Sequence, residues 1–302
     1  MKAQTEGLPG SVALLGLGAA GRCLARWLVA RGQPCPLLWN RDSAVARDLA
    51  AELGGAWVAD PRQALGQSEL ALIAVADSAL AGFVAGLEPP AAGPLRAVLH
   101  LSGARPPSLL APLCRRGLAL GLFHPLAALP RWPSAEPPAA LAIGIRGDAE
   151  ARVLARGLAL RLGAAVVELA EDDAAQLRYH AAAALAANGL VGLWAEAEGV
   201  LAAALTAPGD APIAVRSLLA SSLAALERLG PLEAQTGPIQ RGAVDLVGQH
   251  LAALRTHPTA LVLYLDLSRA LLALAGPRLD PQLRQRIQLL LRGPDAGERR
   301  GP

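Results

Sequence analysis

Three glycines stand near the start of the chain at a spacing that suits a phosphate group. The segment Val12–Gly21 is an apolar run that ends in a Gly-x-Gly-x-x-Gly turn and continues into an Arg-bearing helix. In such a turn the first glycine permits the tight bend, the second lets the backbone approach a pyrophosphate, and the third lets the helix pack close to the strand. The diphosphate then lies on the helix N-terminus, where free N–H groups favour negative charge. The predicted phosphate-binding residues are Gly16, Gly18, Ala19, Ala20 and Gly21.

The end of the second predicted strand indicates which dinucleotide is bound. Pro36–Trp39 is followed by Asn40 and Arg41, at about the distance where a ribose-reading residue is expected. An acid there would accept hydrogen bonds from the 2′-hydroxyl of NAD, whereas Arg41 can pair with the 2′-phosphate of NADP. We therefore predict NADP rather than NAD. The alternative is that Arg41 is a solvated residue leading into the helix Ser43–Leu53.

Polar side chains follow three more predicted strands. In a parallel sheet, ligands collect beyond the carboxyl ends of the strands. Ala76 and Asp77 are predicted to flank the path toward the nicotinamide, and Ser102 to donate a hydrogen bond to nicotinamide or substrate. The alternative for Ser102 is a hydroxyl that caps the following helix. His124 follows Leu118–Phe123 and is held extended by the proline after it, so it is expected at the ligand edge.

The first long helix of the second half carries two further candidates. His180 and Asn188 lie eight residues apart and therefore share broadly one helix face. Imidazole is the side chain that titrates nearest neutrality, so His180 is a candidate proton donor; the alternative is a buried, hydrogen-bonded helix residue. Asn188 is expected either to orient a substrate carbonyl or to bond a neighbouring backbone group.

Arg241 is expected in the first turn of a helix that begins near Pro238. A cation there opposes the helix dipole, by about 0.3–1 kcal/mol, so something must compensate it. One possibility is a helix pair with Asp245. The other is a substrate carboxylate or cofactor phosphate bound by Arg241 together with N–H groups near Thr236 and Gly237.

These candidates require a particular order of elements. Apolar strands alternate with helices in the first half, which predicts a doubly wound parallel sheet over residues 1–170. Long helical stretches with prolines at several starts predict an all-α domain over residues 171–302. The remaining predicted strands are Ala56–Val58, Glu69–Val75, Arg96–Leu101, Leu141–Ile145 and Ala165–Leu169. The predicted helices are Pro61–Leu65, Pro107–Arg116, Asp148–Leu162, Asp172–Leu205, Pro212–Leu229, Pro238–Arg255, Pro258–Leu274 and Pro281–Leu291. Residues 130–138 and the tail after Arg292 are predicted loops.

Composition argues against several other classes of protein. The net charge is only +3, aromatic residues make up 3%, and the arginines are scattered, so no nucleic-acid surface is predicted. Val12–Ala30 is apolar, but Arg22, Arg26 and the glycine turn interrupt it, so it reads as strand, turn and helix and no membrane span is expected. No charged leader precedes it, which predicts a cytoplasmic protein.

Neither the cysteines nor the histidines are spaced as ligands. Cys23, Cys35 and Cys114 form no Cys-x-x-Cys pair and are expected to be reduced. The five histidines lack any tight ligand spacing, so no metal site is predicted.

Four further segments carry a specific resemblance. They are HLSGA (His100–Ala104), GLFHPL (Gly121–Leu126), YHAAAALAANGL (Tyr179–Leu190) and TGPIQRG (Thr236–Gly242). In this order after the glycine turn, they resemble the family that joins a Rossmann-like domain to the domain of unknown function 2520. The resemblance implies a nucleotide-binding domain, then a helical domain, often dimeric. It also implies an architecture related to ketopantoate reductases, pyrroline-carboxylate reductases and β-hydroxyacid dehydrogenases.

The chain departs from that pattern at two positions. Ala243 stands where the last motif usually has an aspartate, and Gln235 stands where an apolar residue is common. Related dehydrogenases place a catalytic lysine on the long helix, but Ala184 occupies that turn here and the sole lysine is Lys2. The proton is therefore expected from His180 or His124. The resemblance places the TGPIQRG motif at an interdomain cleft, which favours an anion as the partner of Arg241.

Together these observations predict an NADP-dependent oxidoreductase that reduces the carbonyl of a small, ketopantoate-like 2-oxo acid. Two alternatives remain open. One is a non-catalytic NADP-binding sensor or scaffold. The other is a cyclic imine reductase of the pyrroline-carboxylate type, in which an already protonated imine needs no strong acid. A homodimer through the helical domain is expected.

Overall fold

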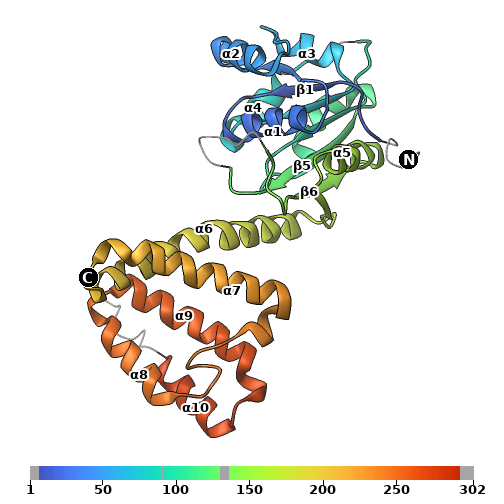
Figure 1. Cartoon of the computed structure of the whole chain (residues 1–302). Coiled ribbons are helices and arrows are strands. Elements are labelled where there is room, and N and C mark those ends of the chain that lie inside the picture. The colour runs from blue at the N-terminus through green and yellow to red at the C-terminus, as the bar shows by residue number, and fades with distance from the viewer. Residues whose placement is uncertain (1–6, 90, 130–135, 293–302) are drawn as a thin grey trace, which may run out of the picture. The chain divides into compact units, whose positions relative to one another are not determined.

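The computed structural model describes residues 7–89, 91–129 and 136–292. Contacts within the chain divide it into two compact units, Met1–Ala187 and Asn188–Pro302, each of which is considered by itself. The first holds a sheet covered by helices and the second is helical (Figure 1). Most of the predicted loop at 130–138, and the tail after Arg292, lie outside the described residues.

The sheet of the first unit has seven strands in the order β2-β1-β3-β4-β5-β6-β7. Their bounds are β1 Val12–Leu15, β2 Leu37–Trp39, β3 Leu70–Ile73, β4 Ala97–His100, β5 Ala119–Leu126, β6 Ala142–Gly147 and β7 Ala165–Glu168. Strands β1 to β5 are parallel, and β1 lies between β2 and β3, so the strand order reverses beside β1. The glycine turn follows β1 and thus stands at the point where doubly wound sheets bind ligands.

The far side of the sheet differs from the prediction of a wholly parallel sheet. Strand β6 is antiparallel to β5, and β7 is parallel to β6. A parallel neighbour requires a crossover, usually a helix, and the described residues between β5 and β6 form none. His124 of β5 faces Gly144 of β6 in this antiparallel pair.

Helices cover both faces of the sheet, as predicted. Helices α1 Ala19–Ala30, α2 Ser43–Leu53 and α5 Ala149–Arg161 pack on one face. Helices α3 Pro61–Gln67 and α4 Asp77–Ala85 and the 3-10 helix η2 Pro107–Arg116 pack on the other. Alternate residues of β1 serve the two faces: Leu14 is buried against the first set and Leu15 against the second.

Two predicted elements have a different form. Ala56–Val58 is not a strand but makes a single bridge, between Trp57 and Leu38. Pro107–Arg116 is a 3-10 helix rather than an α-helix, with Pro112 inside it. Proline removes a backbone donor, which hinders a regular α-helix at that point.

The second unit is built from long helices, which confirms the prediction. α6 Asp173–Ala204 begins in the first unit and ends in the second, and is followed by α7 Ala211–Ala234, α8 Val244–Ala253, α9 Pro258–Ala275 and α10 Pro281–Leu290, with short 3-10 turns η3 Pro208–Asp210, η4 Leu254–Thr256 and η5 Gly276–Arg278. α7 is kinked at Gly230, where φ is 73° ahead of Pro231. Val247, Leu265 and Ile287 belong to the small buried core of the second unit.

One helical segment of the described chain, Pro258–Arg278, is long and apolar enough to cross a membrane by length and composition alone. A core helix of a soluble protein meets the same criterion, and Leu265 and Leu272 of this segment belong to the buried core. Cys23, Cys35 and Cys114 are free thiols. Within the described ranges, no group of three or more His, Cys, Asp or Glu side chains is arranged to hold a metal ion.

Candidate functional site

The glycine turn has a backbone that side chains would disturb at two of its three glycines. Gly16 has φ of 102°, and a Cβ there would lie 2.8 Å from the carbonyl of Ala74. A Cβ at Gly21 would overlap the carbonyl oxygen of Gly16. Gly18 is the N-cap of α1, and a Cβ there would have no described atom within 4 Å. No side chain of the described residues caps this end of α1. The turn can therefore accept an anion on the first N–H groups of α1.

Asn40 supports this turn rather than standing free for a ribose. Its Oδ1 accepts a hydrogen bond of 3.0 Å from the N–H of Leu17, and its Nδ2 donates one of 3.1 Å to the carbonyl of Asp42. Asn40 therefore ties the end of β2 to the glycine turn. Arg41 is exposed, and no described residue pairs with its guanidinium, so it is available to an anion.

The ends of β4 and β5 form a buried polar cluster. His124 lies within β5 rather than after it, because the strand continues to Leu126. A Cβ at Gly103 would lie 2.7–2.9 Å from the His124 ring, so only glycine leaves room for it. The Ser102 hydroxyl is buried and has no hydrogen-bond partner among the described residues, so it does not cap a helix. His100, fully buried, places its Nε2 3.3 Å from the carbonyl of Pro106 and leaves Nδ1 unpaired.

Tyr179 joins this cluster, although sequence reasoning assigned it no role. Its hydroxyl lies 2.7 Å from Nδ1 of His124, with the two rings edge to face. Gly144, opposite His124 in the sheet, makes room for the hydroxyl, since a Cβ there would overlap it. The His180 ring centroid is 6.2 Å from that of His124. The Tyr179-His180 pair at the start of the third motif was the signal available in the sequence.

Burial keeps the His124–Tyr179 pair uncharged near neutral pH. Burial, together with the neighbouring His180, lowers the pKa of His124 to about 4, and the charge of Asp77 opposes the shift. Burial also lowers the pKa of His100 to about 4 and raises the pKa of Tyr179 above its ordinary value. At neutral pH the pair therefore consists of a neutral imidazole and a protonated phenol. If His124 carries its proton on Nδ1, it donates to the phenol oxygen and leaves the Tyr179 O–H free for a ligand.

Ala76 and Asp77 stand at the same edge of the sheet. Ala76 is the N-cap of α4 and Asp77 its first residue, and both are exposed. The Asp77 carboxylate is close enough to raise the pKa of both His100 and His124 against the effect of burial. The structure thus brings Asp77, Ser102, His124, Tyr179 and His180 into one region of the first unit.

Asn188 belongs to the second unit. It is exposed and forms no side-chain hydrogen bond within the described part of the chain. The alternative in which it bonds a neighbouring backbone group is therefore wrong.

The prediction for the local structure around Arg241 is also wrong. Residues 238–242 form a turn between Gly237 (φ 92°) and Gly242 (φ 67°), and α8 begins only at Val244. Arg241 therefore does not oppose a helix dipole. Asp245, its proposed helix partner, instead lies 3.6 Å from Arg286.

The Arg241 guanidinium is exposed and has no partner in the described ranges. Thr236 is exposed as well. Gln235, unusual for the motif, donates a hydrogen bond of 3.1 Å to the carbonyl of Leu271 and so ties this loop to α9.

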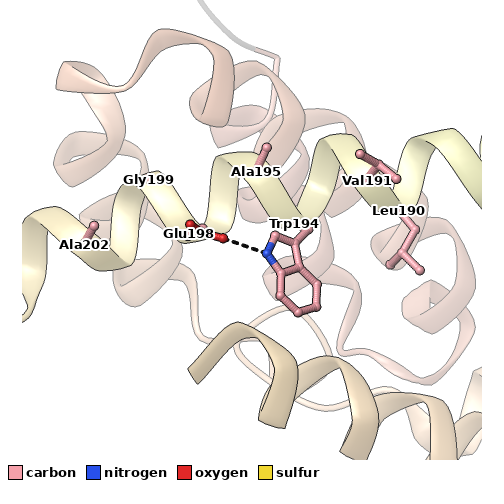
Figure 2. Close-up of a pocket in the computed structure, with 7 residues that line it drawn as sticks. All are labelled: Leu190, Val191, Trp194, Ala195, Glu198, Gly199 and Ala202. Atoms are coloured by element: carbon pink, nitrogen blue, oxygen red, sulfur yellow. Dashed lines mark hydrogen bonds between the residues drawn. The ribbon is translucent and has the colours of Figure 1, made fainter. Parts of the chain in front are cut away.

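A groove of about 620 Å³ runs along α6 in the second unit (Figure 2). Leu190, Val191 and Trp194 give it an apolar lining, and its one charged group, Glu198, accepts a 2.7 Å hydrogen bond from the Trp194 indole. None of the candidate catalytic side chains lines it. We interpret it as part of an apolar surface of the helical unit rather than as the catalytic site.

Fold and site together define a Rossmann-type nucleotide-binding unit followed by a helical unit. Comparison with family models agrees: a Rossmann-like domain matches residues 11–125, and the domain of unknown function DUF2520 matches residues 141–271. Both domains of the family that the motifs resemble are thus matched, each over its own part of the chain. No curated protein sequence matches it significantly.

Several solved structures share the fold. A reductive aminase from Aspergillus terreus in complex with NADPH and ethyl levulinate is 20% identical, with a TM-score of 0.64 over 92% of this chain and 98% of that one. An imine reductase from Pseudomonas sp. is 19% identical, with a TM-score of 0.65 over 93% and 99%. A pyrroline-5-carboxylate reductase from Coxiella burnetii is 15% identical, with a TM-score of 0.59 over 86% and 98%. At these identities the likeness establishes the fold.

Proposed function

We propose that this protein is an NADPH-dependent reductase that acts on a polarised C=O or C=N bond. The observation that carries the proposal is the His124–Tyr179 hydrogen bond of 2.7 Å beside the unpaired hydroxyl of Ser102. Both lie at the sheet edge that also carries the glycine turn, where nicotinamide cofactors bind in this fold. The shared fold with proteins solved in complex with NADPH supports the choice of cofactor.

The residues present fit NADPH. Gly16 to Gly21 would bind the pyrophosphate, Arg41 the 2′-phosphate, and Ala76 and Asp77 would flank the path to the nicotinamide. Asn40 acts indirectly, by holding the turn to β2. When bound, the cofactor supplies the hydride.

Tyr179 is the group best suited to give the proton. The pKa of His124, about 4 because of burial, leaves too little imidazolium at neutral pH for a direct donor. His124 instead orients the Tyr179 hydroxyl, which donates its proton to the alkoxide oxygen that forms from a carbonyl, or to the nitrogen of an imine that binds unprotonated. Ser102 orients the atom that accepts the proton. His180 lies close enough to His124 to help return a proton to Tyr179 after the reaction.

Two substrate classes fit the proposal. One is a small 2-oxo acid: the second unit carries the exposed, unpaired Arg241 near Thr236 and Gly237, and a guanidinium with backbone N–H groups can bind a carboxylate. A cyclic imine is favoured by a different observation: Asp77 is the negative charge that raises the pKa of His100 and His124 against burial, and a negative charge stabilises an iminium cation. The likeness in fold to an imine reductase and a pyrroline-5-carboxylate reductase supports this second class.

The test is an assay of NADPH oxidation against a panel of small 2-oxo acids and cyclic imines, with NADH in parallel. We expect turnover with one class, and a rise in KM for NADPH but not for NADH in Arg41→Ala. Tight NADPH binding without turnover of any compound would contradict the proposal and support the sensor or scaffold alternative.

A further inference from the structure

A second buried polar network lies beside the His124–Tyr179 pair. Arg146 of β6 is 7% exposed and Gln176 of α6 is 1% exposed. The Arg146 guanidinium donates a hydrogen bond of 2.7 Å to Oε1 of Gln176 and one of 2.8 Å to a carboxylate oxygen of Asp173. It also donates a hydrogen bond to the backbone carbonyl of Glu171. The first turn of α6 is thereby fastened to the sheet.

Gln176 also reaches the loop after β4. Its Nε2 donates to the carbonyl of Arg105 and lies 3.4 Å from the carbonyl of Gly103. Gly103 packs directly on the His124 ring and adjoins Ser102. The amide of Gln176 therefore joins the loop that carries Ser102 to the helix that carries Tyr179.

The register of the two elements places this network and the reacting groups side by side. Gln176 and Tyr179 are three residues apart on α6 and so lie on one side of the helix. Gly144 and Arg146 alternate on β6 and so face the same side of the sheet. Gly144 makes room for the Tyr179 hydroxyl, and Arg146 holds Gln176.

We propose that Gln176, held by Arg146, is a positioning residue that sets the Ser102–Gly103 loop against His124 and Tyr179. Anchoring α6 alone would need only the bonds from Arg146 to Asp173 and Glu171. The two carbonyls that Gln176 binds on the loop have no part in that anchoring. In its effect on turnover, the inference rests on the proposed reductase function.

The variant Gln176→Glu separates the contact of Gln176 with Arg146 from its contacts with the loop carbonyls. The carboxylate can still accept from Arg146, but it has no N–H to donate to Gly103 and Arg105, and it repels their carbonyl oxygens. Displacements on the order of 1 Å near reacting groups reduce rates strongly, so we expect kcat to fall about 10- to 100-fold. KM for NADPH should change less than about two-fold, because the glycine turn is not touched.

A second readout requires no substrate. Histidine-ring NMR of the substrate-free protein measures the titration of His124, whose pKa burial holds near 4. Loosening of the loop in Gln176→Glu admits water to this ring, and the new carboxylate also favours the imidazolium, so the midpoint should rise toward 6.5, the ordinary value. A rise in Arg146→Lys as well, where the charge is unchanged, would come from the loop alone. Arg156→Gln is the matched control, because Arg156 pairs with Glu168 on α5 and β7 at a half-exposed site.

The outcomes are distinct. An unchanged kcat together with an unchanged His124 titration in folded Gln176→Glu would overturn the inference. If the wild type turns over no substrate, the proposed function fails, and the His124 titration alone decides the positioning role. If Gln176→Glu does not fold, Arg146→Lys replaces it: the charge stays but the fork to Gln176 is lost, and an unshifted His124 titration in that variant would overturn the inference.

Discussion

Tyr179 and His124 work as one unit because each determines what the other can do. The hydroxyl lacks a second described partner, and the imidazole is kept uncharged by burial. Neither residue alone would stand out chemically. Their hydrogen bond, beside the unpaired Ser102 hydroxyl, is the reason for proposing a proton donor other than a lysine.

We expect Tyr179→Phe to lower kcat by about 10²- to 10³-fold, since general acid catalysis contributes that much. NADPH binding, measured by fluorescence titration, should be unaffected. The chain offers a matched control in Tyr264→Phe, because the Tyr264 hydroxyl lies 2.9 Å from Nδ1 of His250 in the helical unit and the two rings are again edge to face. Equal losses in the two variants would show that Tyr179 has no special role.

The buried histidines should make stability depend on pH. His100 and His124 have pKa values lowered by burial to about 4, against 6.5 when unfolded. The unfolded chain therefore binds more protons between pH 6.5 and pH 4, and the stability present above pH 6.5 is lost as pH falls through this window. For each residue the full loss is about 3 kcal/mol.

Urea unfolding at about pH 7.5, 6, 5 and 4.5, values that span this window, measures how the free energy of unfolding depends on pH. In His100→Gln the dependence on pH should be weaker, because one of the two depressed groups is gone. A free energy of unfolding that is flat down to pH 5 in the wild type would contradict the burial of both rings.

At the scale of elements, the glycine turn allows its structural and its binding roles to be separated. Gly21→Ala should lower the melting temperature, because its Cβ would overlap the Gly16 carbonyl oxygen. Gly18→Ala should leave the melting temperature within about 2 °C, because Gly18 faces open space and has φ of −69°. It should still weaken NADPH binding, since that open space is where the pyrophosphate would approach.

Calorimetry and NADPH titration of the two variants measure these effects. Normal NADPH affinity in a stable Gly18→Ala protein would place the cofactor elsewhere.

Most elements could be predicted from local pattern because their signals are local. The helix Ser43–Leu53 has its predicted bounds, with Asp42 as an N-cap and Gly54 as a left-handed C-cap. The start of α8 could not be predicted, because Pro238 equally suits a helix start and a turn. The turn ends at Gly242, where φ is 67° and a Cβ would lie 2.9 Å from the Leu283 side chain of α10. The direction of β6 depends on its partner strand, which no local pattern encodes.

At the scale of the whole molecule, the helical unit leaves large apolar side chains exposed. Val191 and Ile213 are each 69% exposed, and Leu218 is 61% exposed. Exposed apolar surface on this scale is typical of protein interfaces. We therefore propose a homodimer through α6 and α7.

Light scattering after gel filtration should give twice the chain mass at micromolar concentration. The double variant Val191→Glu with Ile213→Glu should shift the protein to the monomer, because two charges buried in an interface are strongly unfavourable. Arg216→Glu, at an exposed position of α7, is a control for the change in charge alone. A monomeric wild type would exclude this interface.

The sequence by itself determined the two-part architecture, the glycine turn and the family, because these depend on spacing within short segments. It also brought His124 and Ser102 to one edge, since parallel strands end together. Only the tertiary structure showed that Tyr179 bonds His124, that Asn40 is occupied by the backbone, and that Arg146 and Gln176 hold the loop of Ser102. The physical reason is that these contacts join residues 23 to 73 positions apart. Their pairing depends on how strands and helices pack, and not on any local pattern.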